Sequence, residues 1–120
     1  MLFKAQVGKD EFWNDLDYAM GAGPGLIIDG KINIDYEKEG FTEKKITEYS
    51  SARSAIGYTK NEHLIMITTR ATIAELAQIM ASLGCVEAMN LDGGASSGLY
   101  FSGNYVVEPG RDISNIIYIK

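Results

Sequence analysis

The sequence predicts a single α+β domain in which a curved, mixed β-sheet with hairpins is covered by two amphipathic helices. Three observations predict this class. Short apolar runs bounded by turn residues outnumber helical segments, two segments repeat apolar residues at helical spacing, and no internal repeat or low-complexity tract is present. With 120 residues, 46% of them hydrophobic, the chain can form one core but not two.

The N-terminal quarter is expected to contain a helix and then a hairpin. Apolar residues recur at helical spacing over residues 10–20, and Gly21 follows where a helix end favours a left-handed residue. Strands at 26–28 and 31–34 flank Asp29-Gly30, a dipeptide typical of two-residue hairpin turns.

A polar segment and a second hairpin are expected next. Residues 35–49 are rich in Glu and Lys, which indicates a solvated excursion, either an exposed loop or an active-site lid. Strands at 54–58 and 64–69 then form a hairpin around Lys60-Asn61.

The clearest helix signal begins at Thr72. Thr72 is a good N-cap, and Glu75, three residues later, can complete a capping box. Gly84 ends the helix. One apolar stripe predicts the buried face, and it consists of Ile73, Leu76, Ala77, Met80 and Leu83.

The C-terminal third is predicted to be strands. Apolar runs at 86–91, 99–101 and 105–107 indicate three of them, with Gly103-Asn104 as a tight turn, and residues 113–119 form a last strand.

The turn after the strand at 86–91 combines groups that suit chemistry on a sugar or a phosphate. Asp92 would emerge at a strand end, and Gly93-Gly94 permit backbone angles that let several N–H groups face one anion. Ser96 and Ser97 add hydroxyls that donate and accept, and Asp92 can act as acid, base or cation ligand. The alternative is a tight hairpin whose Asp and Ser only satisfy the turn.

Four segments, taken in order, resemble the phosphodiester glycosidase family. They are Gly21-Ala-Gly-Pro-Gly-Leu-Ile-Ile-Asp-Gly-Lys31, Ala52-Arg-Ser-Ala-Ile-Gly57, Asn90 to Tyr100, and Gly110 to Ile119. The family includes the lysosomal uncovering enzyme, N-acetylglucosamine-1-phosphodiester alpha-N-acetylglucosaminidase, and many bacterial and phage relatives. The most specific part of the resemblance is Asp-Gly-Gly-x-Ser-Ser preceded by Asn-Leu.

The resemblance implies a hydrolase that cleaves the bond between a sugar anomeric carbon and the phosphate of a sugar-1-phosphodiester. Asp92, Arg53 and Arg111 would then be catalytic, with the arginines holding the phosphate, and all three would meet in one concave pocket. Glycosidases usually use two carboxyl groups, and Glu108 and Asp112 are open candidates for the second, although either could simply pair with Arg111. The expected substrate-binding residues are Gly93, Gly94, Ser96, Ser97, Asn90 and Gly23.

Departures from the family pattern leave two other functions open. Ala95 replaces the third glycine of the family turn and Gly98 replaces its threonine, and nothing before Gly21 resembles the family's Asn-Gly-Gly-Phe-Phe-like segment. Residues 1–120 are therefore expected to form a family domain that lacks the N-terminal part. Such a chain could be a non-catalytic carbohydrate- or cell-wall-binding module, or a fragment completed by the missing segment or by self-association.

Charge and composition narrow the partners. The net charge of −5 argues against nucleic acid as a partner. The family resemblance implies a sugar phosphodiester or a cell-wall glycan as the ligand. No long apolar run or charged leader predicts a membrane span or a signal peptide; the compartment stays open, although family members are often secreted or lumenal. His63 is the only histidine, so an imidazole zinc site is not expected, and no cofactor is certain, but Asp92 with backbone carbonyls could bind calcium or magnesium. Cys85, the only cysteine, is predicted to be buried.

Overall fold

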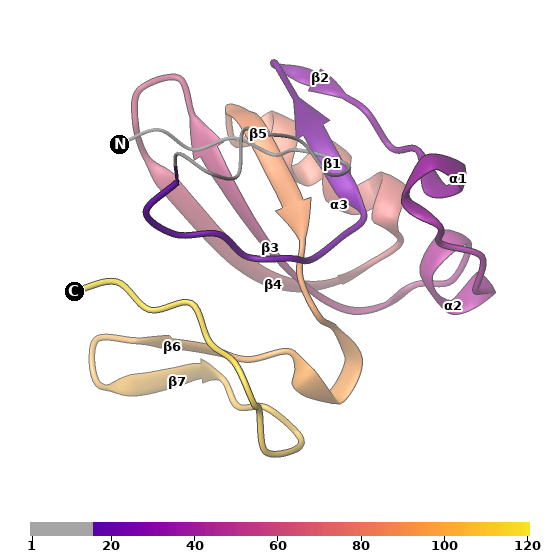
Figure 1. The fold of residues 1–120 in the computed structure, drawn as a ribbon. Coiled ribbons are helices and arrows are strands. Elements are labelled where there is room, and N and C mark those ends of the chain that lie inside the picture. Colours follow the sequence, from indigo (N-terminus) through magenta and orange to yellow (C-terminus); the bar gives the residue numbers. More distant parts are fainter. Residues whose placement is uncertain (1–15) are drawn as a thin grey trace.

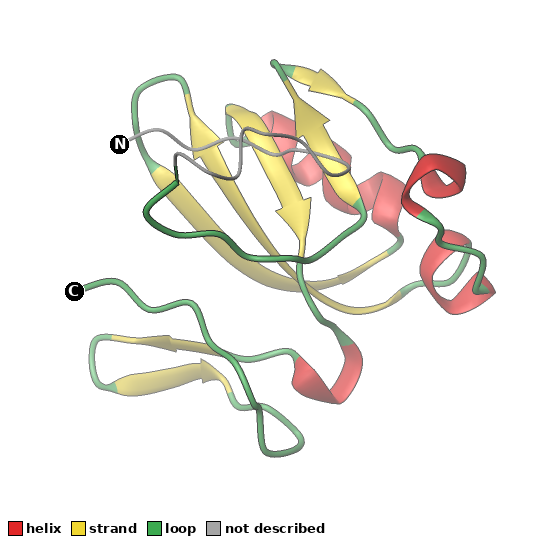
Figure 2. Ribbon diagram, viewed as in Figure 1, coloured by secondary structure: helices red, strands yellow, loops and turns green. Residues whose placement is uncertain are grey.

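The computed structural model describes residues 16–120 and confirms the α+β class. Five strands form one sheet in the order β2-β1-β5-β3-β4, and two more form a separate hairpin (Figure 1). One longer helix, α3, packs behind the main sheet, and two short helices lie at its side (Figure 2).

The first predicted hairpin is confirmed. Strand β1 (Gly25–Ile28) pairs with β2 (Lys31–Ile32) in antiparallel fashion. Asp29 and Gly30, which join them, have φ values of 50° and 78°. Two successive left-handed residues are the signature of the type I′ turn, whose twist matches that of the strands it connects.

The second hairpin is also confirmed, with longer strands than expected. Residues 51–58 of strand β3 (Ser51–Thr59) pair with the whole of β4 (Leu64–Ala71), and β5 (Cys85–Asn90) lies between β3 and β1. Each of these pairings is antiparallel, so the parallel pairs expected of a mixed sheet do not occur among the described strands.

Helix α3 (Ile73–Ser82) begins with the predicted capping box. The backbone N–H of Glu75 donates to Oγ1 of Thr72 at 3.2 Å, and Oε2 of Glu75 accepts from the backbone N–H of Thr72 at 2.8 Å. The apolar face of the helix packs on the sheet because burying Ile73, Leu76, Ala77 and Met80 removes apolar surface from water. Leu83, expected in the same stripe, is instead the C-cap residue and is 46% exposed, because the helix ends before it. Cys85 is buried in this core, as predicted. The core consists of Leu26, Ile27, Ala55, Ala71, Ile73, Leu76, Ala77, Met80, Cys85 and Ala88.

The polar segment 35–49 is not simply a loop. It contains two four-residue helices, α1 (Tyr36–Glu39) and α2 (Lys44–Thr47). Tyr36 and Ile46 pack against the core from these helices, which explains why the segment is ordered despite its charge. Helices this short show no hydrophobic period, so the sequence pattern could not reveal them.

Three further expectations need correction. Residues 16–20 contain no helix, and the rest of the helix expected at 10–20 lies outside the described residues. No strand forms at 113–119, where Ile116, for example, is exposed. The last hairpin, β6 (Leu99–Phe101) and β7 (Asn104–Val107), turns at Ser102-Gly103, because these are the residues with positive φ.

Candidate functional site

The Asp92 turn leaves the main sheet between two neighbouring strands. At the end of β5, the backbone N–H of Asn90 donates to the carbonyl of Pro24 just before β1, at 3.0 Å. The next N–H, that of Leu91, donates to the carbonyl of Ser54 in β3 at 2.8 Å. Asp92 is therefore positioned from both sides at the point where β5 ends.

Both glycines of the turn are required, for different reasons. A Cβ atom on Gly93 would lie 2.7 Å from the carbonyl oxygen of Ala52, so no side chain fits between the turn and β3. Gly94 has a φ of 60° and begins the one-turn 3₁₀ helix η2 (Gly94–Ser96). The turn thus packs tightly on the sheet and then folds back on itself.

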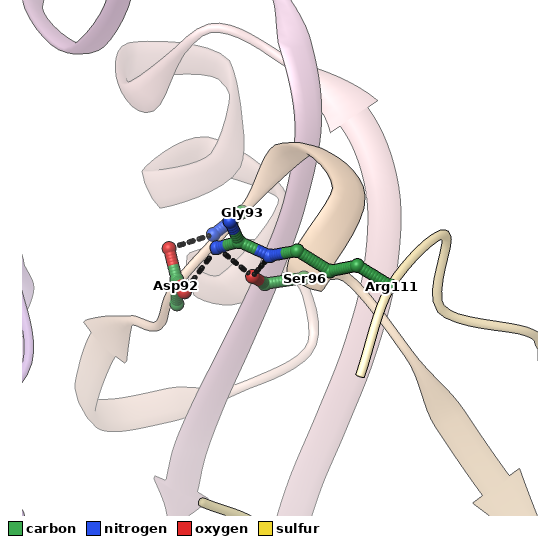
Figure 3. Close-up of polar contacts among 4 residues, drawn as sticks. All are labelled: Asp92, Gly93, Ser96 and Arg111. Carbon is green, nitrogen blue, oxygen red and sulfur yellow. Dashed lines mark hydrogen bonds and ion pairs between the residues drawn. The ribbon is translucent and has the colours of Figure 1, made fainter. Parts of the chain in front are cut away.

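Arg111 connects the carboxylate and a hydroxyl of this turn (Figure 3). Its Nε donates to Oγ of Ser96 at 2.7 Å, and its Nη2 donates to the same oxygen. Nη2 also lies 3.4 Å from Oδ2 of Asp92, while Oδ1 of Asp92 accepts the Gly93 N–H at 2.9 Å. Arg111 therefore meets Ser96, which is 15 residues earlier, and Asp92, which is 19 residues earlier, as the sequence predicts.

The cluster extends from a buried hydroxyl to the surface. Ser96 is 8% exposed, whereas the side chains of Asp92 and Arg111 are 76% and 61% exposed. The concave pocket expected around these residues stays a prediction. A shallow depression elsewhere, between the end of β4 and α3, includes none of the predicted site residues in its lining, which consists of Arg70, Ala71, Glu75, Gln78, Ile79 and Ser82.

Two buried oxygen atoms flank the turn without partners. Asn90 and Ser97 are 5% and 4% exposed, and neither Oδ1 of Asn90 nor Oγ of Ser97 accepts or donates a hydrogen bond within the described part of the chain. The amide nitrogen of Asn90 donates to the carbonyl of Gly23 at 2.9 Å. Unpaired buried polar atoms are costly, which makes these two oxygens candidates for contact with a water molecule or a polar ligand.

Arg53 does not take the position expected of a phosphate ligand. Its side chain turns into the protein, where it is 4% exposed, and its Nε donates to the carbonyl of Ala71 at 3.2 Å. Its Nη2 donates to the carbonyls of Lys45 and Tyr49 at 2.9 and 2.8 Å. Burial lowers the pKa of Arg53, although the Tyr36 hydroxyl opposes this effect. Only its backbone lies beside the turn, with its Cα 3.8 Å from the position of a Cβ on Gly93.

Glu39 is a partly buried carboxylate that the sequence pattern missed. Its two oxygens accept the Gly25 N–H at 3.1 and 3.0 Å, so the glycine-rich segment before β1 is anchored by a carboxylate and does not form a phosphate loop. Burial raises the pKa of Glu39, an effect that the Gly25 hydrogen bond partly offsets. Gly23 has little space either, because a Cβ there would lie 3.0 Å from the Phe41 ring.

No group of three His, Cys, Asp or Glu side chains within residues 16–120 is arranged to hold a metal ion. Calcium or magnesium at Asp92 therefore remains a prediction. Glu108 and Asp112 are exposed, and the ion pair that Arg111 makes in this region is with Asp92. In the same part of the chain no helix has the length and apolarity needed to cross a membrane.

The comparison with protein families agrees with this geometry. The phosphodiester glycosidase family matches residues 4–120, which includes every residue of the Asp92 turn and Arg111. The chain belongs to the phosphodiester glycosidase family.

Solved structures of other proteins share the glycosidase fold of this chain. A hypothetical protein from Synechocystis is 33% identical with a TM-score of 0.73, and the match covers 83% of this chain and 20% of that protein. The zebrafish N-acetylglucosamine-1-phosphodiester alpha-N-acetylglucosaminidase catalytic domain, auto-inhibited by its pro-peptide, is 23% identical with a TM-score of 0.56; the match covers 73% of this chain and 32% of that one. The chain thus spans a third or less of either structure. No curated protein matches it.

Proposed function

We propose that this chain hydrolyses the bond between a sugar anomeric carbon and phosphate in a sugar-1-phosphodiester, with Asp92 and Arg111 at the centre of the site. The observation that supports this most directly is the junction of Arg111 with Asp92 and Ser96 in a member of the phosphodiester glycosidase family. A guanidinium that already bridges a carboxylate and a hydroxyl offers the planar set of donors that a phosphate accepts.

The reaction assigns a different task to each group. The bond from the anomeric carbon to the phosphate oxygen breaks, and a phosphate monoester leaves. Water supplies the hydroxyl of the anomeric carbon, and its remaining proton goes to the phosphate monoester or to solvent. Arg111 stabilises the charge that develops on the leaving phosphate, and Ser96 fixes the position of the guanidinium. Asp92 directs water to, or stabilises positive charge at, the anomeric carbon. The unpaired oxygens of Asn90 and Ser97 can accept hydrogen bonds from the sugar hydroxyls.

A diester that joins N-acetylglucosamine to nitrophenol through one phosphate distinguishes release of the sugar from release of nitrophenol by a phosphodiesterase. Cleavage at the anomeric carbon yields nitrophenyl phosphate, which becomes coloured only after alkaline phosphatase is added. Cleavage on the other side of the phosphorus atom releases coloured nitrophenol at once. We expect phosphatase-dependent colour, measured with and without added calcium or magnesium.

Asp92→Asn should lower this turnover by roughly 10²–10⁴-fold, the range typical of a positioned acid or base. Its melting temperature should change little, because an exposed ion pair contributes only about 0–1 kcal/mol. Asp29→Asn is the matched control, since it removes an exposed carboxylate in the β1–β2 turn, where Asn also tolerates the positive φ, and it should keep full turnover. Equal turnover by the Asp92→Asn variant and the wild type would reject Asp92 as a catalytic residue.

The alternative function is a carbohydrate-binding module, and one observation favours it. The rings of Tyr100 and Tyr105 pack edge to face on the β6–β7 hairpin, with centroids 5.2 Å apart, while 60% and 59% of these residues remain exposed. Exposed aromatic rings offer apolar faces to a sugar and a hydroxyl for hydrogen bonding. Retention on insoluble cell-wall glycan that is lost in Tyr100→Ala, together with absence of turnover, would favour the module over the enzyme.

A further inference from the structure

Lys45 is a second cation beside the Asp92 turn. It belongs to α2, which leads into β3 at the same end of the sheet at which β5 ends. Its Nζ lies 4.0 Å from the position that a Cβ on Gly94 would occupy, so the ammonium group faces the start of η2. Within residues 16–120 this ammonium has no ion pair, whereas the neighbouring Lys44 lies 4.0 Å from a carboxylate oxygen of Glu48.

The side chain of Arg53 holds the backbone of Lys45 through a hydrogen bond. The carbonyls of Lys45 and Tyr49 both accept from Nη2 of Arg53, and the carbonyl of Ala71 accepts from its Nε. A buried guanidinium must have such partners, because an unpaired buried charge is very costly. The hydrogen bonds that Arg53 needs therefore also fix α2 relative to β3 and the end of β4.

The two cations near the turn differ in how they are paired. Arg111 forms an ion pair with Asp92, whereas Lys45 has no ion pair within 4.0 Å among residues 16–120. The protein as a whole carries a net charge of −5. A local positive charge attracts an anion to that place, while the negative charge of the rest of the protein repels the anion elsewhere.

We propose that Lys45 and Arg111 together bind the phosphate group of the substrate, from two sides of the Gly94–Ser96 turn, and that Arg53 positions Lys45. This inference rests on the proposed function and extends it. Arg111 supplies a planar pair of donors, while Lys45 supplies a point charge with three rotatable donors. Arg53, which the sequence assigned to phosphate binding, then acts on the phosphate through the backbone of α2.

The test is a titration of the full chain with inorganic phosphate, followed by calorimetry or by the rise in melting temperature. Lys45→Gln should weaken binding by roughly tenfold, as expected for loss of one hydrogen bond between charged groups. Lys44→Gln, on the same short helix, should bind like the wild type. Lys45→Arg should keep most of the affinity, and binding by the wild type should weaken more steeply with salt than binding by Lys45→Gln.

The role of Arg53 requires a double-mutant cycle, because Arg53→Lys also alters stability. If Arg53 acts through Lys45, Arg53→Lys weakens phosphate binding, and adding Lys45→Gln to it costs little more. Additive losses at a temperature where all four proteins are folded would show that Arg53 affects binding by another route and would overturn that part of the inference.

The remaining outcomes separate this inference from the proposed function. Phosphate binding that is lost in Arg111→Ala but unchanged in Lys45→Gln leaves the proposed function intact and rejects Lys45. Equal losses of phosphate binding in Lys44→Gln and Lys45→Gln would reject a specific contact between Lys45 and phosphate. They would show that binding depends only on the overall positive charge. A wild-type chain that does not bind millimolar phosphate contradicts both proposals.

Discussion

Gly93→Ala tests whether close packing of the turn on β3 holds the site in place. The new Cβ would lie 2.7 Å from the carbonyl oxygen of Ala52, whereas ordinary contacts begin near 3.4 Å. The turn or the strand must therefore move by about 0.7 Å, and the nearest atom is backbone, which cannot rotate away. Overpacking of this kind costs about 1–3 kcal/mol. For a domain of this size, that lowers the melting temperature by about 4–12 °C.

Thermal unfolding is followed by circular dichroism. Turnover of the glycosyl phosphodiester is measured about 20 °C below the lower of the melting temperatures of Gly93→Ala and the wild type, so that both proteins are folded. Turnover should fall by up to about 10²-fold, because displacements near 1 Å have effects of that order. Gly21→Ala is the matched control, since no atom lies within 4 Å of its Cβ position, and it should change stability by less than about 0.5 kcal/mol. A Gly93→Ala protein within 1 °C of the wild type would refute the packing argument.

Two further predictions concern buried ionisable groups. Cys85 is 5% exposed and burial raises its pKa, so a thiol reagent should label the folded chain at least about 100-fold more slowly than the urea-unfolded chain; equal rates would mean that β5 and α3 do not cover it. Burial raises the pKa of Glu39 above its ordinary 4.5, so the folded chain binds this proton more tightly than the unfolded chain. The free energy of unfolding of the wild type, relative to that of Glu39→Gln, should therefore fall as pH rises from about 4.5 through the raised pKa toward 7. Urea unfolding measures this difference, and a difference that grows in favour of the wild type over this range would contradict the prediction.

Elements whose signals are local were predictable from the sequence. The capping box of Thr72 and Glu75, and the turn at Asp29-Gly30, depend on residues no more than three positions apart, and both formed as expected. The Asp92 turn belongs to this class as well, since its two glycines, its carboxylate and its serines are consecutive or nearly so.

The errors arose where the deciding partner is distant in sequence. The strand expected at 113–119 needs a neighbouring strand to pair with, and an apolar run alone does not supply one. The sequence motif predicts that Arg53 contacts the ligand, but an arginine in a short motif gives no indication of where its side chain points. In the structure, carbonyls of Lys45, Tyr49 and Ala71 accept its hydrogen bonds, and all three of these residues are distant from the Asp92 turn in the sequence.

The family, the fold class and the turn that presents Asp92 can be predicted from the residues alone, because they depend on residue type and short spacing. Which distant side chains reach that turn depends on how the strands pair and where the chain returns. Antiparallel pairing of β3 with β5 brings the α2 end of one strand to the Asp92 end of the other, and the return of the chain at Gly110 to the carbonyl of Ala95 brings Arg111 to Ser96. Lys45 and Arg111 are adjacent to the same turn for that reason, although 66 residues separate them in the sequence.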